Sequence, residues 1–304
     1  GPLLVVDTGG WFYRGCPTSQ FARPDILGAI YRVSRDGMTA QIDPRGNLLD
    51  WSAQTHGQLA QLLGDPRYAV RQRAILESAK RGQTMIATLR QTIDRSGILK
   101  RQGAIWTLTN IVGKAIIAEQ QSNPTNQNTS TTQLAAHEAV RLALADQNPL
   151  VQHIAVRSFS TYPDPLAKPQ LIQLLKSEHP EIRREAATAL GRLGDPTAIE
   201  HLLAALANPA DIDRTEDHAI IFALIEIDNV PVTRQGLVSD DPDSQRGALL
   251  AVDQMTQAVD GNLTAEDVLR LVVSQNPRTQ LAAAHVFSQH ADWASHSVDV
   301  IGPL

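Results

Sequence analysis

Residues 179–196 read HPEIRREAATALGRLGDP and contain the pattern that decides the fold. After the proline, apolar side chains recur at spacings that place them on one face of an α-helix: Ile182, Ala186, Ala189, Leu190 and Leu193. Gly194 is expected to end this helix, because glycine favours the position after a helix. Asp195-Pro196 is expected to begin the next one, because aspartate caps helix N-termini and proline fits the first helical position.

The start of this stretch recurs along the chain as a polar residue, a proline and, three residues later, Gln or Arg. The other copies are Asn148-Pro149-Leu150-Val151-Gln152, Asp241-Pro242-Asp243-Ser244-Gln245 and Asn276-Pro277-Arg278-Thr279-Gln280. From Pro149 through Pro180 and Pro242 to Pro277, the steps are 31, 62 and 35 residues. A helical period near 31 indicates stacked helix pairs, so the predicted fold is a mostly α chain, an α-solenoid.

About seven helix pairs are expected, at 53–81, 83–118, 134–161, 166–193, 197–228, 231–258 and 264–290. The stretch 119–133 is polar and uncharged through most of its length and is expected to be an insert between two pairs. Before the helices, 1–35 are expected to hold two short strands, Leu3–Asp7 and Gly28–Val33, followed by a linker over 36–52. The remainder, 291–304, is expected to be a tail or the start of another unit.

Composition limits the classes of function. The 304 residues carry a formal net charge of −5, which argues against a nucleic-acid partner on overall electrostatics. The single cysteine, Cys16, rules out a disulfide within the chain and a CxxCH haem motif. No apolar run approaches the roughly 20 residues that span a bilayer. The chain begins Gly1-Pro2 and ends within the repeat pattern, so we expect it to be part of a longer protein.

Several clusters could carry chemistry, and each has a simpler interpretation. The densest acidic group is Asp211, Asp213, Glu216, Asp217 and His218. Its spacing lacks the features of a calcium loop, and acids in a first helical turn usually complement the helix dipole. The histidines at 285, 290 and 296 are too far apart for a zinc pair on one helix. Cys16 lacks a nearby histidine base in sequence. We therefore expect no catalytic, cofactor-binding or metal-binding residue in this chain.

Arginines near the start of the second helices are the one candidate surface. They are Arg71, Arg73, Arg183, Arg184 and Arg246. One interpretation is a ridge that binds a partner protein. The other, which the pattern favours, is a ladder that pairs with acids of the adjacent repeat, such as Glu77, Glu181 and Glu185.

Two phrases give the helical part a family resemblance. Gly64-Asp65-Pro66 with Val70-Arg71, and the stretch from Pro180 to Pro196, resemble the short bacterial form of the HEAT-repeat family. The resemblance covers most of 53–290 and implies a scaffold that binds other proteins rather than an enzyme.

A narrower resemblance is carried by a set of phrases in order: Val5-Val6-Asp7-Thr8-Gly9-Gly10-Trp11, Gly28-Ala29-Ile30-Tyr31-Arg32-Val33, Ala79-Lys80-Arg81-Gly82, Gln102-Gly103-Ala104-Ile105-Trp106-Thr107-Leu108 and His218-Ala219-Ile220-Ile221-Phe222-Ala223-Leu224. They resemble multidomain proteins of planctomycetes and verrucomicrobia with a sorbosone-dehydrogenase-like β-propeller, HEAT repeats and a c-type cytochrome domain. That resemblance implies that 1–35 are terminal propeller strands and that the parent is exported and carries a c-type haem.

Three functions are consistent with this sequence. The first is a docking scaffold within such a parent, whose partners are the adjacent propeller and cytochrome domains or another polypeptide. The second is a stand-alone protein-interaction module without a redox role. The third is an enzyme with its site near Asp7 and Cys16.

Overall fold

The computed structural model describes residues 3–7, 9, 27–34, 37, 41–122, 129–207, 213–255 and 263–296. The chain divides into two compact units. The first comprises Gly1–Asp50 with Arg67–Ala69, and the second comprises Trp51–Pro66 with Val70–Leu304. Each unit is described separately.

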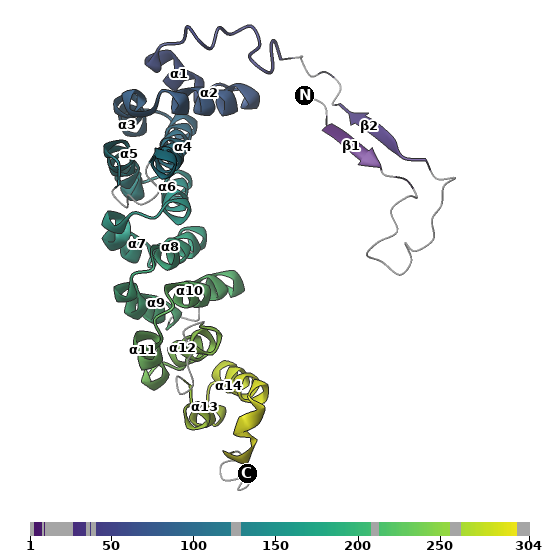
Figure 1. The fold of residues 1–304 in the computed structure, drawn as a ribbon. Coiled ribbons are helices and arrows are strands. Elements are labelled where there is room, and N and C mark those ends of the chain that lie inside the picture. The colour runs from purple at the N-terminus through teal and green to yellow at the C-terminus, as the bar shows by residue number, and fades with distance from the viewer. Residues whose placement is uncertain are drawn as a thin grey trace. The chain divides into compact units, whose positions relative to one another are not determined.

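Helices alternate as first and second members of seven pairs in the described residues (Figure 1). The first helices are α1 (His56–Leu62), α3 (Ile86–Arg95), α5 (Thr131–Leu142), α7 (Lys168–Leu174), α9 (Ile199–Leu206), α11 (Val230–Thr233) and α13 (Ala265–Val272). The second helices are α2 (Tyr68–Lys80), α4 (Ile98–Ser122), α6 (Pro149–Thr161), α8 (Pro180–Leu193), α10 (Arg214–Ile227), α12 (Pro242–Gln254) and α14 (Pro277–Gln289). The predicted α-solenoid of about seven pairs is confirmed.

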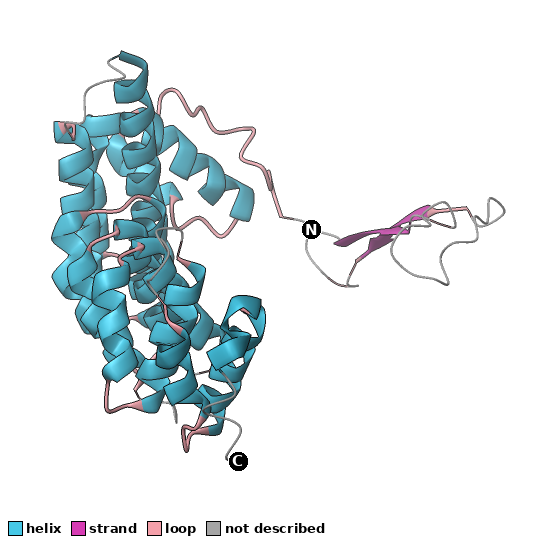
Figure 2. Ribbon diagram, turned by 60° about the horizontal axis from the view of Figure 1, so that its bottom comes forward, coloured by secondary structure: helices cyan, strands magenta, loops and turns pink. Residues whose placement is uncertain are grey.

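Short 3-10 turns precede or extend several first helices. They are Gly82–Met85, Ala143–Ala145, Pro165–Ala167, Pro196–Ala198 and Arg234–Val238, and a last one covers Ala291–His296. In the helical unit the described elements are all helices and turns, joined end to end by loops (Figure 2).

The second helices from α4 to α14 form one continuous layer. Each contacts the next: α4 with α6, α6 with α8, α8 with α10, α10 with α12 and α12 with α14. Small residues allow α8 and α10 to approach closely. A Cβ atom on Gly191 would lie 2.7 Å from the Cα of Ala223, so only glycine fits at this crossing. The first helices pack behind this layer and share its apolar core, in which Leu190 and Ile199 are fully buried.

The recurring polar residue before each proline acts as a helix cap. The side chain of Asn148 accepts from the backbone N–H of Leu150 at 3.1 Å, Asp241 from Ser244 at 2.7 Å, and Asn276 from Arg278 at 2.9 Å. His179 occupies the same position without a side-chain cap bond. As expected, Gly194 ends α8 with a left-handed backbone (φ 70°), and Asp195 caps the following turn.

The Gln or Arg three residues after the proline also has a structural role. In three repeats its side chain donates to a backbone carbonyl in the turn before the helix: Gln152 to Leu144 at 2.7 Å, Arg183 to Ser177 at 2.9 Å, and Gln245 to Ser239 at 2.6 Å. Because that carbonyl belongs to the turn between the two helices, the contact fixes one helix of a pair against the other. The recurring sequence therefore has two structural roles: its polar residue caps the second helix, and its Gln or Arg forms a brace, a hydrogen bond to the turn before that helix.

The first unit contains a two-stranded antiparallel sheet. Strand β1 (Leu3–Asp7) pairs with β2 (Ala29–Val33), with Leu3 opposite Val33 and Asp7 opposite Ala29. Side chains on both faces of this ribbon are exposed, and most of them are apolar. Of the rest of 1–35, most residues, including Cys16, lie outside the described part of the chain.

The segment expected as a linker contains fixed turns where it is described. Asp43 has a positive φ of 46°, and its carboxylate accepts from the N–H groups of Asn47 at 2.7 Å and Leu48 at 3.0 Å. In the second unit Trp51 is buried, and the guanidinium of Arg73 lies 4.8 Å from its ring centroid. Asp43 is thus held by hydrogen bonds within the first unit, and Trp51 by its contact with Arg73 within the second.

The expected insert is shorter at both ends in the described residues. Helix α4 continues to Ser122, and α5 begins at Thr131 with Ser130 as its cap. Positions 123–128 lie outside the described residues. At the other end of the chain, the described part of the expected tail is the turn Ala291–His296. None of the described helices is long and apolar enough to cross a membrane.

Candidate functional site

Helix α10 receives arginines from the helices on either side of it. From α8, Arg183 binds both carboxylate oxygens of Glu216, with Nε to Oε1 at 2.6 Å and Nη2 to Oε2 at 2.7 Å. Glu216 is buried, and a paired arrangement of two parallel hydrogen bonds is the strongest geometry that arginine and carboxylate can form. The same arginine donates to the Ser177 carbonyl, so one side chain links α10 to the turn before α8.

A second contact from α8 lies at the N-terminus of α10. Asp213 caps the helix by accepting from the N–H of Glu216 at 2.8 Å, and Arg184 Nη1 lies 2.9 Å from its other oxygen. The hydrogen bond from Glu216, together with the charge of Arg184, holds the pKa of Asp213 below its usual range. The carboxylate is therefore charged when it caps the helix.

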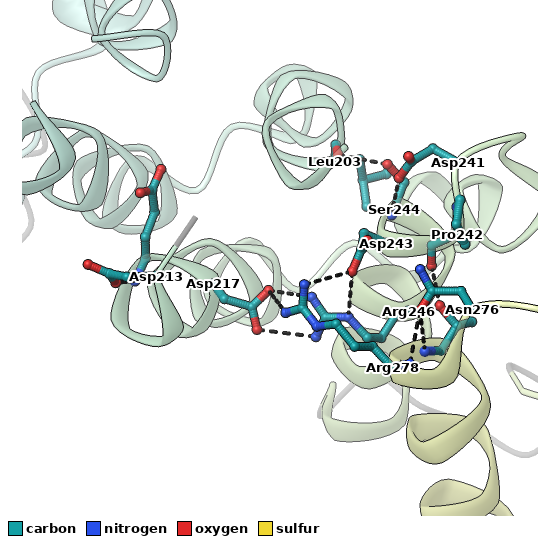
Figure 3. A network of polar contacts seen from close by, with 12 residues as sticks. Leu203, Asp213, Asp217, Asp241, Pro242, Asp243, Ser244, Arg246, Asn276 and Arg278 are labelled. Atoms are coloured by element: carbon teal, nitrogen blue, oxygen red, sulfur yellow. Dashed lines mark hydrogen bonds and ion pairs between the residues drawn. The ribbon is translucent and has the colours of Figure 1, made fainter. Parts of the chain in front are cut away.

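On its other side α10 meets α12 and α14 through a four-residue network (Figure 3). Arg246 of α12 pairs with Asp217 of α10 and lies 3.2 Å from Asp243 on its own helix. Arg278 of α14 reaches the same two carboxylates, at 3.1 Å from Asp243 and 3.4 Å from Asp217. Two cations and two anions from three repeats thus meet at one point.

The four residues of this network balance one another's charge. Arg246 and Asp243 are buried, so each charge depends on its partners to offset the loss of hydration. The set has equal numbers of positive and negative charges, and every arginine in it is shared between two carboxylates. Such an arrangement fixes how consecutive repeats face each other.

The five arginines expected as a ridge fall into two separate places. Arg183, Arg184 and Arg246 belong to the network around α10. Arg71 instead donates to the carbonyls of Asp65 at 2.7 Å and Pro66 at 3.2 Å, the same brace that Arg183 forms in its own repeat. Arg73 lies over the Trp51 ring.

Of the three acids expected to pair with these arginines, Glu77 lies near one of them on the same helix, and Glu181 and Glu185 contact other side chains. Glu181 lies 3.8 Å from His179, Glu185 contacts His153 and Arg157, and Glu77 lies beside Lys80 and at 3.9 Å from Arg73 on its own helix. The partners across the repeats are Asp213, Glu216 and Asp217. Three acids of the cluster thus meet three arginines of the expected ridge, although the two groups look unrelated in the sequence. Asp211 of that cluster lies outside the described residues.

A signal for this pairing is present in the sequence spacing. Arg183 and Glu216 are 33 residues apart, Arg184 and Asp213 are 29 apart, and so are Asp217 and Arg246. Each separation is close to one repeat, which is the distance between equivalent positions on neighbouring second helices.

The other candidates are not brought together. His290 lies 2.8 Å from Asp253 and stacks on Trp293 at 3.8 Å between centroids, whereas His285 is exposed on α14. The Asp7 carboxylate accepts from the N–H of Gly9 at 2.9 Å, which closes a local turn. Among the described residues, no three histidine, cysteine, aspartate or glutamate side chains gather as metal ligands would.

Known proteins support the fold at a coarse level. A family model for HEAT repeats matches residues 138–221, which run from α5 into α10. No curated protein matches the chain. A chain in the structure of Kap95p with RanGDP is 13% identical with a TM-score of 0.51, and the match covers 84% of this chain and 37% of that one. This protein thus spans little more than a third of that relative.

Two further structures have lower TM-scores. The complex of CpcE and CpcF of phycocyanin lyase from Nostoc sp. PCC7120 gives 14% identity, coverage of 84% and 99%, and a TM-score of 0.41. A designed armadillo repeat protein is 15% identical, the match covers 77% of this chain and 99% of that one, and the TM-score is 0.39. The helix pairs and the family match over residues 138–221 give the chain a HEAT/armadillo-like repeat fold.

Proposed function

We propose that this chain is a non-catalytic scaffold that docks other proteins on its layer of second helices. The observation behind the proposal is the continuous layer from α4 to α14, which presents one surface across six repeats. Repeat arrays of this kind expose extended surfaces because each unit packs only on its neighbours. The similar Kap95p structure contains RanGDP, so a chain of comparable fold is found there in a protein complex.

A narrower part of the proposal concerns the parent protein. The β1–β2 ribbon is apolar on both faces, with Leu3, Val5 and Tyr31 on one side and Val6 and Ile30 on the other. A sheet of this composition suits a position between two other sheets, as blades have in a propeller. Together with the resemblance noted above, this favours a parent with an upstream propeller, export from the cytoplasm and a c-type haem domain.

The alternative is a stand-alone interaction module without a redox role. The full-length reading frame distinguishes the two proposals. A multidomain parent is expected to encode a propeller before this chain and a CxxCH motif after it. If the intact protein has neither, the stand-alone module is favoured.

Docking itself is tested by crosslinking mass spectrometry on the intact protein in its native cell. The proposal expects crosslinks from a partner domain or polypeptide to side chains of the second helices. Crosslinks confined to the first helices would contradict it.

A further inference from the structure

In two of the pairs across neighbouring second helices, the arginine side chain is much more exposed than the carboxylate. Arg157 of α6 lies 3.7 Å from Glu185 of α8, with side chains 56% and 15% exposed. Arg192 of α8 lies 3.1 Å from Glu226 of α10, with 55% and 17% exposed. Although each pair is neutral, the arginine is the more exposed of the two side chains.

The first-helix layer shows the contrasting arrangement. Arg90 of α3 lies 3.1 Å from Glu138 of α5, and the two side chains are exposed to nearly the same extent, 53% and 56%. The pair Arg184–Asp213, at the N-terminal end of α10, also leaves its acid exposed. Arg157 in the α6–α8 seam and Arg192 in the α8–α10 seam are therefore two arginines that are more exposed than the acids they pair with.

An exposed aromatic pair lies on the same helix as the second seam. Phe222 is four residues before Glu226 on α10, so it lies on the same side of that helix. It is largely exposed and stacks with His218 at 6.1 Å between centroids. Aromatic and arginine side chains are the residues most enriched at the energetic centres of protein interfaces.

We propose that Arg157, Arg192, His218 and Phe222 form a docking face for an acidic peptide segment that carries an apolar side chain. The half-exposed guanidiniums have donors that reach solvent and can bind carboxylates in addition to their recessed partners. Phe222 offers the apolar contact. This inference rests on the proposed scaffold function and specifies its partner. A peptide is favoured over nucleic acid because a short peptide needs only one carboxylate for each arginine and one apolar side chain for Phe222, whereas a phosphate backbone needs an extended positive surface that a chain with a net charge of −5 does not offer here.

The test is fluorescence anisotropy of the full chain with a fluorescein-labelled peptide of Asp and Glu residues around one Leu. Binding is expected, and it weakens as salt is raised. Arg157→Gln and Arg192→Gln each lower affinity by about fivefold, the effect of losing one exposed charge pair. Phe222→Ala lowers it as well. Arg90→Gln, the matched pair on the other layer, leaves affinity unchanged. Glutamine avoids a repulsion with the recessed acids, and circular dichroism verifies that each variant is folded.

Three results would overturn the inference. The first is that the acidic peptide does not bind. The second is that Arg90→Gln lowers its affinity as much as Arg157→Gln and Arg192→Gln do. The third is that a single-stranded RNA binds more tightly than the peptide and loses this binding in the same two arginine variants. If native crosslinks to the second helices persist while the acidic peptide does not bind, this inference fails and the scaffold function stands. If those crosslinks are missing as well, both fail.

Discussion

Glu216 is the residue on which two repeats depend most directly. It is buried and is held by two hydrogen bonds from Arg183. Removal of one partner from a buried pair leaves an uncompensated charge, so Glu216→Ala is expected to lower the free energy of unfolding by about 3–5 kcal/mol.

The control is Glu138→Ala, which breaks the exposed pair with Arg90 and is expected to cost less than about 1 kcal/mol. Urea unfolding followed by circular dichroism measures both. Equal losses would mean that the α8–α10 pair adds nothing beyond a surface contact.

His137 makes stability depend on pH at the junction of the third and fourth repeats. It is buried on α5, 5.8 Å from the Phe159 ring, and its Nδ1 lies 3.9 Å from Asp164, which also pairs with Arg141. Burial is the main reason that its pKa lies below the ordinary value of 6.5; Arg141 lowers the pKa further, and Asp164 opposes both.

The direction of the pH effect follows from that shift. The folded state holds a neutral imidazole, whereas the unfolded chain takes up a proton as pH falls through about 6.5. The contribution of the neutral His137 to stability is therefore fully present above that pH and is lost as the pH falls further. The melting temperature of the native chain is expected to fall more than that of His137→Leu between about pH 7.5 and about pH 5.5. The exposed His285→Gln serves as control and should retain the native slope. An unchanged slope in His137→Leu would contradict this assignment.

At the scale of the helix, the caps explain why the sequence pattern is so regular. Asp241 caps α12 with a 2.7 Å bond, whereas His179 begins α8 without a side-chain cap. Asp241→Ala is expected to cost about 1 kcal/mol, as is typical of a lost cap, and His179→Ala only a few tenths of that. Thermal unfolding of the two variants decides the point. If His179→Ala destabilised the chain as much as Asp241→Ala, the loss of stability in Asp241→Ala could not be assigned to the cap hydrogen bond.

Helix spacing between α8 and α10 is set by Gly191. Gly191→Ala would force a Cβ against the backbone of Ala223, at a cost of about 1–3 kcal/mol for overpacking. Gly57→Ala on α1 meets no atom within 4 Å and is expected to be neutral or stabilising by up to about 1 kcal/mol. Comparison of their unfolding midpoints tests this. A neutral Gly191→Ala would mean that the two helices can separate freely.

The helix pairs could be predicted because their signals are local. The cap at Asn148, the stop at Gly194 and the apolar stripe through Leu190 each lie within a few residues of what they control. The pairing of Arg183 with Glu216 could not be assigned in the same way, because it depends on which positions of neighbouring repeats face each other. The fixed turn at Asp43 was missed because its positive φ is stabilised by hydrogen bonds from residues further along.

At the level of the whole chain, the helical unit supports itself, whereas the exposed β1–β2 ribbon does not. The repeats carry their own interfaces, each with its buried apolar layer and many with a charge pair between helices. The ribbon pairs only β1 with β2 in the described residues, and two strands are marginally stable alone.

Hydrogen exchange on this chain tests that division most directly. The account predicts fast exchange across β1 and β2 and slow exchange across α8, α10 and α12, where opening must break apolar packing and paired charges together. Strong protection of Leu3–Asp7, or exchange in α8 as fast as an unprotected ribbon would show, would contradict it.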